Sequence, residues 1–268
     1  MQHLKLGNPI AAVANFIGKT ATIAELEARK LHHDQTEVLT RAVQPALWLL
    51  IFGEVLAQTR AIQTGSLPYL DFMTPGILAQ SVLFIAIFFG IAVIWERDLG
   101  TLHKLLASPA PRSALVLGKA LSASERGLAQ AAIIYLLAFA LGVKLNLDPL
   151  ALVGVLFVVV LGSALFSTFS LIIACLVKTR ERFMGIGQLL TMPLFFASNA
   201  IYPISVMPSW LQAISQVNPL TYEVDALRAL MVVGGTSVYG FALDLGFLLA
   251  TTALLIVAGA RLYPRVVV

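Results

Sequence analysis

The sequence has few charged residues and a single cysteine. Charged residues make up 12% of the 268 positions, against roughly 25% in soluble domains, while hydrophobic residues make up 59%. This composition is typical of a polytopic membrane protein. Because Cys175 has no second cysteine to pair with, a disulfide within the chain and a thiolate metal cluster are excluded. We expect a cytoplasmic N-terminal segment, residues 1–40, followed by one transmembrane domain, residues 41–268.

The motifs of an enzyme are missing as well. Residues 18–20 (Gly-Lys-Thr) match the end of a phosphate-binding loop, but that loop requires a glycine where the chain has Val13. His32 and His33 point to different sides of a helix and have no third ligand at a matched spacing, so a solvated helix end is the better interpretation. All four histidines lie outside the apolar runs, which argues against catalysis inside the membrane. We expect no enzymatic activity, cofactor or metal in this chain.

Six apolar runs predict the fold. A helix that crosses the hydrocarbon core needs about 20 mostly apolar residues. The runs cover residues 42–57, 72–95, 115–143, 150–177, 183–204 and 239–262. The first run is the weakest, because it is short and contains Pro45 and Glu54. The predicted fold is an all-α polytopic membrane protein with six transmembrane helices.

The positions of lysine and arginine predict the orientation. If the N-terminus is cytoplasmic, fourteen of these basic residues fall on the inner side and three on the outer side. Cytoplasmic flanks of membrane helices carry an excess of such residues, so both termini are expected in the cytoplasm. Because the basic residues flank membrane segments, the net charge of +4 predicts contact with anionic lipids and not with nucleic acid. The polar segment 21–39 is predicted to form an amphipathic helix along the inner interface, with a loosely ordered tail as the alternative.

Five ionisable residues lie in or near the apolar runs. Glu54 and Asp244 are near the outer ends, where they can reach the headgroups, and Lys119 can extend to the cytoplasmic face. Glu125 and Arg126 lie deeper, and we expect them where the third helix meets another protein surface. No acidic relay crosses the predicted bilayer, which weakens a proton-coupled mechanism.

A charged, amphipathic stretch, residues 96–109, separates the second and third runs. Its leucines form one stripe on a helix: Leu99, Leu102 and Leu106. Asp98 fits an N-cap, Gly100 allows close approach of another backbone, and Pro109 stops the helix. We predict a short cytoplasmic helix that docks another protein; the alternative is an interfacial helix lying on lipid.

The segment between the fifth and sixth runs predicts two short helices on the outer face. Pro208 and Pro219 each fit a first helical position, and Asn218 fits the N-cap before the second helix. Four apolar residues share one face of that helix: Leu220, Val224, Leu227 and Met231. Asp225 and Arg228 can pair at i,i+3. Both helices are too short to span, so they are expected to dip into the membrane and return.

These two segments carry patterns that resemble a known family. The first pattern comprises Glu96, Arg97, Gly100, Thr101, Leu105, Ser108 and Pro109. The second comprises Pro203, Met207, Pro208, Trp210 and Leu211, then Asn218 to Tyr222 and Asp225 to Arg228. Together they resemble the ABC-2 type transporter permeases, especially the branch of daunorubicin-resistance and nodulation-factor export permeases. The resemblance extends from about residue 25 to residue 235, and Asp98 departs from the glutamate that many relatives carry.

The resemblance implies a six-helix subunit that works as a pair. The resemblance also implies that each copy docks on a separate cytoplasmic ATPase subunit, which binds ATP and Mg. The implied second permease copy makes a homodimer or a heterodimer. The implied coupling helix contacts the ATPase through Glu96, Arg97, Gly100, Thr101, Lys104 and Leu105.

The resemblance also implies an extracellular gate of short re-entrant helices. Its residues are Pro203, Pro208, Trp210, Asn218, Pro219, Tyr222, Asp225 and Arg228. The implied function is export of a hydrophobic or amphipathic molecule, such as a drug, a lipid or a lipid-linked glycan, across a prokaryotic plasma (inner) membrane. The sequence does not identify the cargo. It also does not decide whether Glu54, Arg126 or Asp244 touches that cargo.

Two other functions stay open at this point. A secondary carrier would transport without a partner, driven by an ion gradient, although the shortage of intramembrane carboxylates argues against it. A non-transporting membrane scaffold would copurify with an ATPase but produce no flux of cargo.

Overall fold

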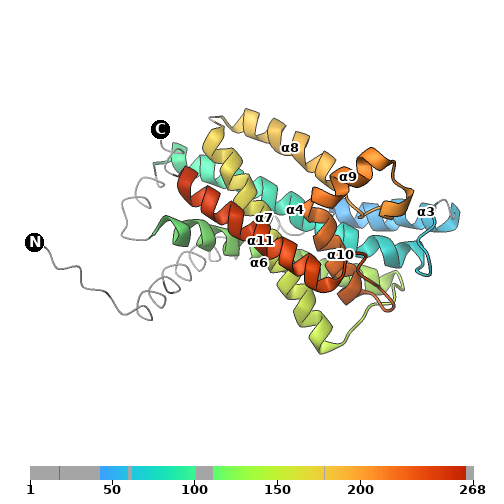
Figure 1. Cartoon of the computed structure of the whole chain (residues 1–268). Helices are drawn as coiled ribbons and strands as arrows, with labels where there is room; N and C mark the ends of the chain where they lie inside the picture. Colours follow the sequence, from blue (N-terminus) through green and yellow to red (C-terminus); the bar gives the residue numbers. More distant parts are fainter. Residues whose placement is uncertain (1–17, 19–42, 60–61, 101–110, 178, 264–268) are drawn as a thin grey trace, which may run out of the picture.

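The computed structural model describes residues 18, 43–59, 62–100, 111–177 and 179–263. Long helices packed side by side form a bundle with two ends (Figure 1). The first helix covers residues 43–59 and includes a π-helical turn, η1 (Trp48–Gly53), followed by α3 (Glu54–Thr59). The long helices are α4 (Tyr69–Asp98), α6 (Arg112–Ala140), α7 (Pro149–Leu176), α8 (Arg180–Phe196) and α11 (Phe241–Leu262). The short ones are η2 (Ile204–Val206), α9 (Ser209–Val217) and α10 (Pro219–Met231). The interfacial helix expected at 21–39 lies outside the described residues.

Helices α4 and α7 form the centre of the bundle. α7 packs against α4, α6 and α11, and α10 is wedged against α4, α7 and α11. Small residues allow the close approach of α4 and α7, as is usual between membrane helices. The Ser170 hydroxyl on α7 accepts a bond from the Gly90 amide at 3.1 Å and donates to the Ile87 carbonyl, both on α4. The contact fixes the two central helices side by side.

Among the described residues, three helices are long and apolar enough to cross a membrane: α4, α7 and α11. At 30 residues and 1.5 Å per residue, α4 is about 45 Å long, which exceeds a hydrocarbon core of about 30 Å. The other three expected spans are present as helices of the bundle but do not meet the same criteria. α6 carries charged residues along its first half, α8 has 17 residues, and the first helix is short. The six-pass topology therefore stays a prediction.

The fifth apolar run is not helical to residue 204 as predicted, because α8 ends at Phe196. α8 begins at Arg180, where the Thr179 hydroxyl accepts a bond from the Arg182 amide at 3.4 Å. Beyond Phe196 the chain bends, and the Ala200 backbone packs directly against Gly76 of α4. The buried Asn199 then bonds to α10. These contacts of the segment 197–203 with α4 and α10 replace a continued helix.

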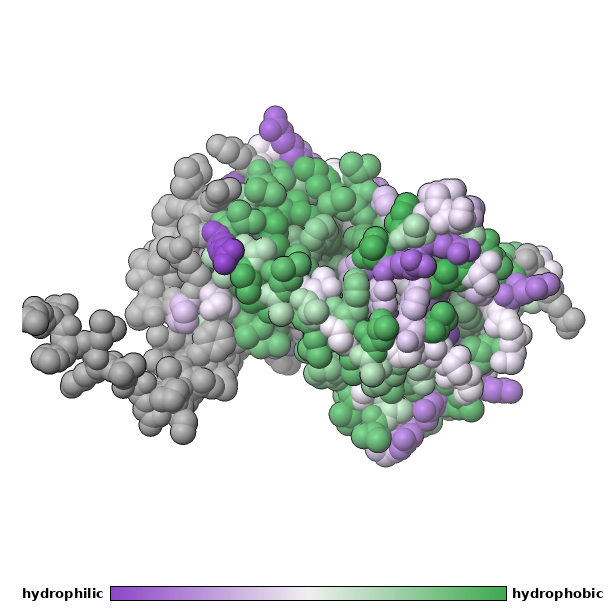
Figure 2. Space-filling model, viewed as in Figure 1, coloured by the Kyte–Doolittle hydropathy of each residue, from purple (hydrophilic) through white to green (hydrophobic). Residues whose placement is uncertain are grey.

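The outer surface of the bundle agrees with a lipid environment. Figure 2 shows apolar residues across the middle of one face and hydrophilic residues toward the end where α9 and α10 lie. Large apolar side chains on α8 and α11 are widely exposed, with Leu189 at 70% and Leu254 at 70%. In water such a surface would aggregate, whereas lipid chains cover it without cost.

Candidate functional site: the two ends of the bundle

The first candidate site is the end of α4. Glu96, Arg97 and Asp98 form its last turn, so the expectation that Asp98 caps the start of a new helix is wrong. Gly100 has φ +71 and its amide donates to the Arg97 carbonyl at 2.9 Å, which is how glycine ends a helix. The glycine therefore serves a helix end here. Three other predicted coupling residues, Thr101, Lys104 and Leu105, lie outside the described residues.

An ion pair joins this end of α4 to α6. The Lys119 ammonium donates to the Glu96 carboxylate at 2.6 Å, and the Lys119 side chain is only 2% exposed. The Lys119 side chain therefore reaches the end of α4, where its ammonium is buried against Glu96; that this end is the cytoplasmic face stays a prediction. A buried ammonium requires a nearby anion, and Glu96 supplies it. Glu96 thus holds two helices of this chain together, whatever else it contacts.

A second set of charges joins α4 to the start of α8. The Asp98 carboxylate accepts from Arg97 and from Arg180, each at 3.0 Å. The Arg180 guanidinium lies 4.5 Å from the centre of the Trp95 ring. These groups are partly exposed, so each pair contributes little to stability. Their effect is to bring the end of α4 and the start of α8 together on one polar surface.

Arg126 also contacts α4, by its guanidinium, which lies 5.4 Å from the centre of the Phe89 ring. We expected Glu125 and Arg126 to lie where the third helix meets another protein surface. For Arg126, part of that surface is α4 of this same chain.

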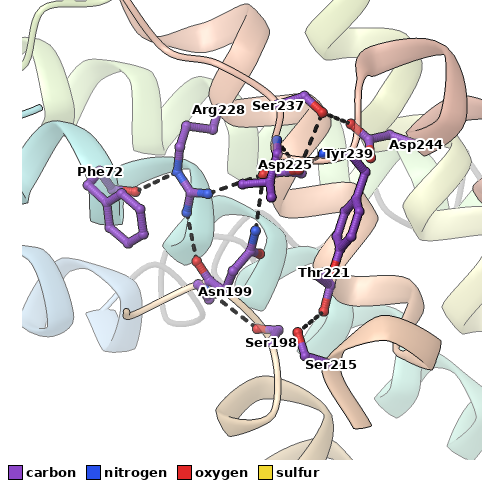
Figure 3. Close-up of polar contacts among 12 residues, drawn as sticks. Phe72, Ser198, Asn199, Ser215, Thr221, Asp225, Arg228, Ser237, Tyr239 and Asp244 are labelled. Carbon is purple, nitrogen blue, oxygen red and sulfur yellow. Dashed lines mark hydrogen bonds and ion pairs between the residues drawn. The ribbon is translucent and has the colours of Figure 1, made fainter. Parts of the chain in front are cut away.

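The second candidate site is a polar cluster around α10, at the opposite end of the bundle (Figures 1 and 3). The predicted pair of Asp225 and Arg228 is confirmed, with 3.5 Å between the guanidinium and the carboxylate. Asn199 donates its side-chain amide to Asp225 at 3.1 Å. The other carboxylate oxygen accepts from the backbone amides of Val238 at 2.6 Å and Tyr239 at 3.2 Å. Asp225 therefore fixes the turn that leads from α10 into α11.

Arg228 is almost completely buried and is satisfied from several elements. It donates to the carbonyls of Asn199 at 2.7 Å and Phe72 at 3.4 Å, and its guanidinium lies 3.9 Å from the centre of the Phe72 ring. Burial lowers the pKa of Arg228 to about 10, and the nearby Asp225 opposes this change. The side chain remains charged at neutral pH, and it connects α10 to α4 and to the segment after α8.

Asp244 belongs to the same cluster, so the expectation that it reaches the headgroups is wrong. Its side chain is 0% exposed and accepts a bond from the Ser237 hydroxyl at 2.7 Å. The same hydroxyl accepts from the Gly240 amide at 2.7 Å. Asp244 therefore holds the start of α11 against the turn after α10.

The remaining predicted gate residues position α9 and α10. The Asn218 side-chain oxygen Oδ1 accepts from the Leu220 amide at 3.0 Å, as an N-cap does, and its side-chain Nδ2 donates to the Leu194 carbonyl of α8 at 2.7 Å. The Tyr222 ring stacks on Phe247 of α11 with 4.0 Å between ring centres. Trp210, in contrast, is 64% exposed on α9. Pro219 is the first residue of α10, whereas Pro208 lies one residue before α9, and Pro203 lies just before η2.

Sequence reasoning missed Glu223, a fully buried carboxyl on α10. It is 0% exposed, and neither carboxylate oxygen has a hydrogen-bond partner within the described residues. Burial raises the pKa of this carboxyl well above its ordinary value. No sequence signal marks it, because the apolar stripe of α10 suggests one buried face, whereas the structure buries this helix on every side.

Within the described ranges, no three His, Cys, Asp or Glu side chains gather closely enough to hold a metal ion.

The chain is a helical multi-pass membrane protein. Its apolar helices form a bundle with a charged end and a polar end, and the short helices of the polar end begin near prolines. Residues 20–232 match the family model of the ABC-2 type transporter. The chain belongs to this family, whose members are transmembrane permeases of ABC transporters.

Named relatives agree with the family model. The chain is 33% identical over 198 residues to the "Putative transport permease ycf38" of Cyanophora paradoxa, covering 72% of this chain and 67% of that protein. It is 27% identical over 233 residues to the "Daunorubicin resistance ABC transporter permease protein DrrB1" of Streptomyces coeruleorubidus, covering 87% and 80%. It is 25% identical over 197 residues to "Nodulation protein J" of Rhizobium leguminosarum bv. trifolii, covering 73% and 74%.

Proposed function

We propose that this permease is the membrane subunit of an exporter that moves a hydrophobic or amphipathic molecule out of the cytoplasm. The observation that carries the proposal is the family match over residues 20–232. The resemblance to permeases named for daunorubicin resistance and nodulation supports export of a drug-like compound, a lipid or a lipid-linked glycan. ATP hydrolysis takes place on a separate cytoplasmic ATPase, which binds ATP and Mg, and two permease copies form the pathway.

The end of α4 is the part of this chain that contacts the ATPase. Arg97 and Asp98 are partly exposed there, and Arg180 of α8 lies on the same surface, whereas Lys119 of α6 is buried against Glu96. Force applied at this end would reach α6 through Glu96–Lys119 and α8 through Asp98–Arg180. The coupling role extends along the chain to Thr101, Lys104 and Leu105. Residues of α9 and α10 form the outer gate, and both termini lie in the cytoplasm of a prokaryotic cell.

Charge reversal at the end of α4 tests the coupling role. The Arg97→Glu permease, reconstituted with its ATPase in liposomes, is expected to lose most ATP-driven flux and most stimulation of the ATPase while it unfolds like the wild type. Arg97 is suitable because its carboxylate partner, Asp98, also pairs with Arg180. Glu96→Lys is less informative, since it would place a second ammonium beside the buried Lys119.

The matched control is Asp148→Lys, which reverses an exposed charge before α7 at the opposite end of the bundle. It is expected to transport normally. Equal loss of transport in both variants, or normal coupling in Arg97→Glu, would show that the end of α4 is not the coupling surface.

The secondary-carrier alternative is tested in the same liposomes without ATPase. Cargo flux driven by an ion gradient across permease-only vesicles would contradict the proposed function. Absence of flux from the complete complex would favour the scaffold alternative.

A further inference from the structure

Glu223 occupies a closed site between three helices. It projects from α10, which packs against α4, α7 and α11, and its side chain is 0% exposed. Gly162 of α7 leaves the space for it, because a Cβ at that position would collide with the Glu223 carboxylate. Within the described part of the chain, neither oxygen of this carboxylate receives a hydrogen bond.

The charges on the surrounding helices are engaged elsewhere. α7 contains no acidic or basic residue. On α11, Asp244 bonds to Ser237 and Arg261 lies in the last turn, remote from α10. On α10, Asp225 and Arg228 pair with each other and with the loops around them.

The charged residues of α4 lie at its two ends. Asp71 lies in the first turn of α4, where it interacts with the backbone and the charge of Lys144. Glu96, Arg97 and Asp98 lie in the last turn. Burial is the cause of the raised pKa of Glu223, without a contribution from a neighbouring charge.

An ionised carboxylate in such a site would be costly. Transfer of an isolated charge into a medium of low dielectric constant is so unfavourable that a buried carboxyl protonates instead. We propose that Glu223 is a proton-binding site that controls the seating of α10: the carboxyl holds its proton while α10 packs against Gly162 and gives it to water when α10 separates. The O–H bond breaks on separation, the proton goes to solvent, and the carboxylate is hydrated.

The direction of the pH effect follows from linkage. The seated carboxyl has a raised pKa, and the separated carboxyl has the ordinary value of about 4.5. As the pH rises above that ordinary value, the separated state loses its proton first and is favoured. Separation of α10 therefore becomes easier with rising pH, by up to about tenfold per pH unit for one proton, until the seated carboxyl also ionises. This inference does not depend on the cargo or on the direction of transport.

Hydrogen exchange of the full-length permease in lipid nanodiscs tests the proposal. The protection factors of the α10 amides, corrected for the intrinsic pH dependence of exchange, are expected to fall with rising pH in the wild type. In Glu223→Gln, a neutral isostere of the protonated acid, this fall is expected to disappear, with higher protection than wild type at high pH. Titration of Asp71 and Asp244 is common to both proteins and cancels in the comparison. Glu181→Gln removes an exposed carboxyl at the start of α8 and is expected to behave like the wild type.

Infrared difference spectra give a second reading. A carbonyl stretch of a protonated carboxylic acid is expected at neutral pH in the wild type and is lost in Glu223→Gln. An unchanged pH slope and unchanged band in Glu223→Gln would overturn the proposal, and so would a Glu223→Gln protein that does not fold, since a neutral side chain of this shape is what the site is proposed to hold.

A double-mutant cycle tests the geometry independently. Gly162→Ala is expected to reduce the protection of α10 in the wild type, because the new methyl group displaces the carboxyl. In a Glu223→Ala background the same substitution is expected to have a smaller effect. Equal effects in both backgrounds would show that Glu223 does not occupy the space beside Gly162.

Discussion

Asp225 organises its surroundings more than any other side chain at the α10 end. Its carboxylate is buried, pairs with Arg228, and accepts bonds from Asn199 and from two consecutive backbone amides. Moving two opposite charges out of water costs more than their attraction returns unless further hydrogen bonds complete both groups. Here those bonds come from three separate segments. The pair therefore holds a particular arrangement of the loops around α10.

Asp225→Asn is expected to lower the free energy of unfolding by about 3 kcal/mol, because it removes the charge that offsets a buried guanidinium. Reversible unfolding of the purified permease in mixed micelles measures the change. Asp148→Asn, an exposed aspartate whose carboxylate caps no helix, is the control and is expected to have no measurable effect. Equal stability of the two variants would show that the cluster contributes nothing.

The sequence could predict part of this cluster. The i,i+3 spacing of Asp225 and Arg228 predicted their pair, and Asn218 before Pro219 predicted the N-cap. Asn199 and Ser237 carried no such signal, because their bonds to the cluster depend on how α8 and α11 pack around α10. The partner of Lys119 carried no signal for the same reason: Glu96 lies 23 positions earlier on another helix. Contacts within one turn of a helix are readable from spacing, whereas contacts across helices are not.

Helix α4 depends on a glycine where it meets the segment after α8. A Cβ at Gly76 would lie 2.6 Å from the Ala200 Cα atom, and backbone cannot move aside as the end of a side chain can. The position keeps α4 close to the loop that supplies Asn199 to the polar cluster.

Gly76→Ala is expected to destabilise the permease by about 1–3 kcal/mol through this overpacking. Gly246→Ala is the matched control, since Gly246 lies within α11 and a Cβ there meets no atom within 4 Å. That control is expected to be neutral or to stabilise by up to about 1 kcal/mol, because alanine favours a helix over glycine. Thermal unfolding of both variants in detergent decides the matter; a Gly76→Ala protein as stable as Gly246→Ala would contradict the close contact.

Helix limits were predictable where composition decides them. The six apolar runs correspond to six helical stretches, and α7 differs by one residue at each end from the predicted run. The ends of α4 and α8 were not predictable from composition, because α4 continues through charged residues to Asp98 and α8 stops within an apolar run. Gly100 ends the first, and packing of the 197–203 segment ends the second. Hydropathy cannot report either event.

Successive connections between the long helices lie at opposite ends of the bundle. The loop between α6 and α7 bonds to the loop after α10, with 2.8 Å between the Asn146 amide and the Met231 carbonyl and a β-bridge between Leu145 and Val232. Asp98 and Arg180 meet at the other end. This alternation supports the proposed six-pass topology.

Single-cysteine labelling in whole cells tests that topology. The native Cys175 is buried, so a Cys175→Ala background is expected to fold. With a membrane-impermeant thiol reagent, Asp148→Cys and Ser209→Cys are expected to be labelled in intact cells, and Glu181→Cys only after permeabilisation. Labelling of Asp148→Cys and Ser209→Cys from opposite sides would rule out six passes.

The π-helical turn Trp48–Gly53 has a consequence for comparing relatives of different length. Such a turn accommodates one inserted residue within an α-helix. Deleting one residue there would restore regular helix and rotate the part before Trp48 by about 100° against α3. Trp48 contacts Phe195 of α8, with 5.8 Å between ring centres, so the rotation would also move that contact. A relative with an alignment gap of one position inside the first helix therefore turns a different face of the part before Trp48 toward α8. It must pair this helix with α8 through different side chains.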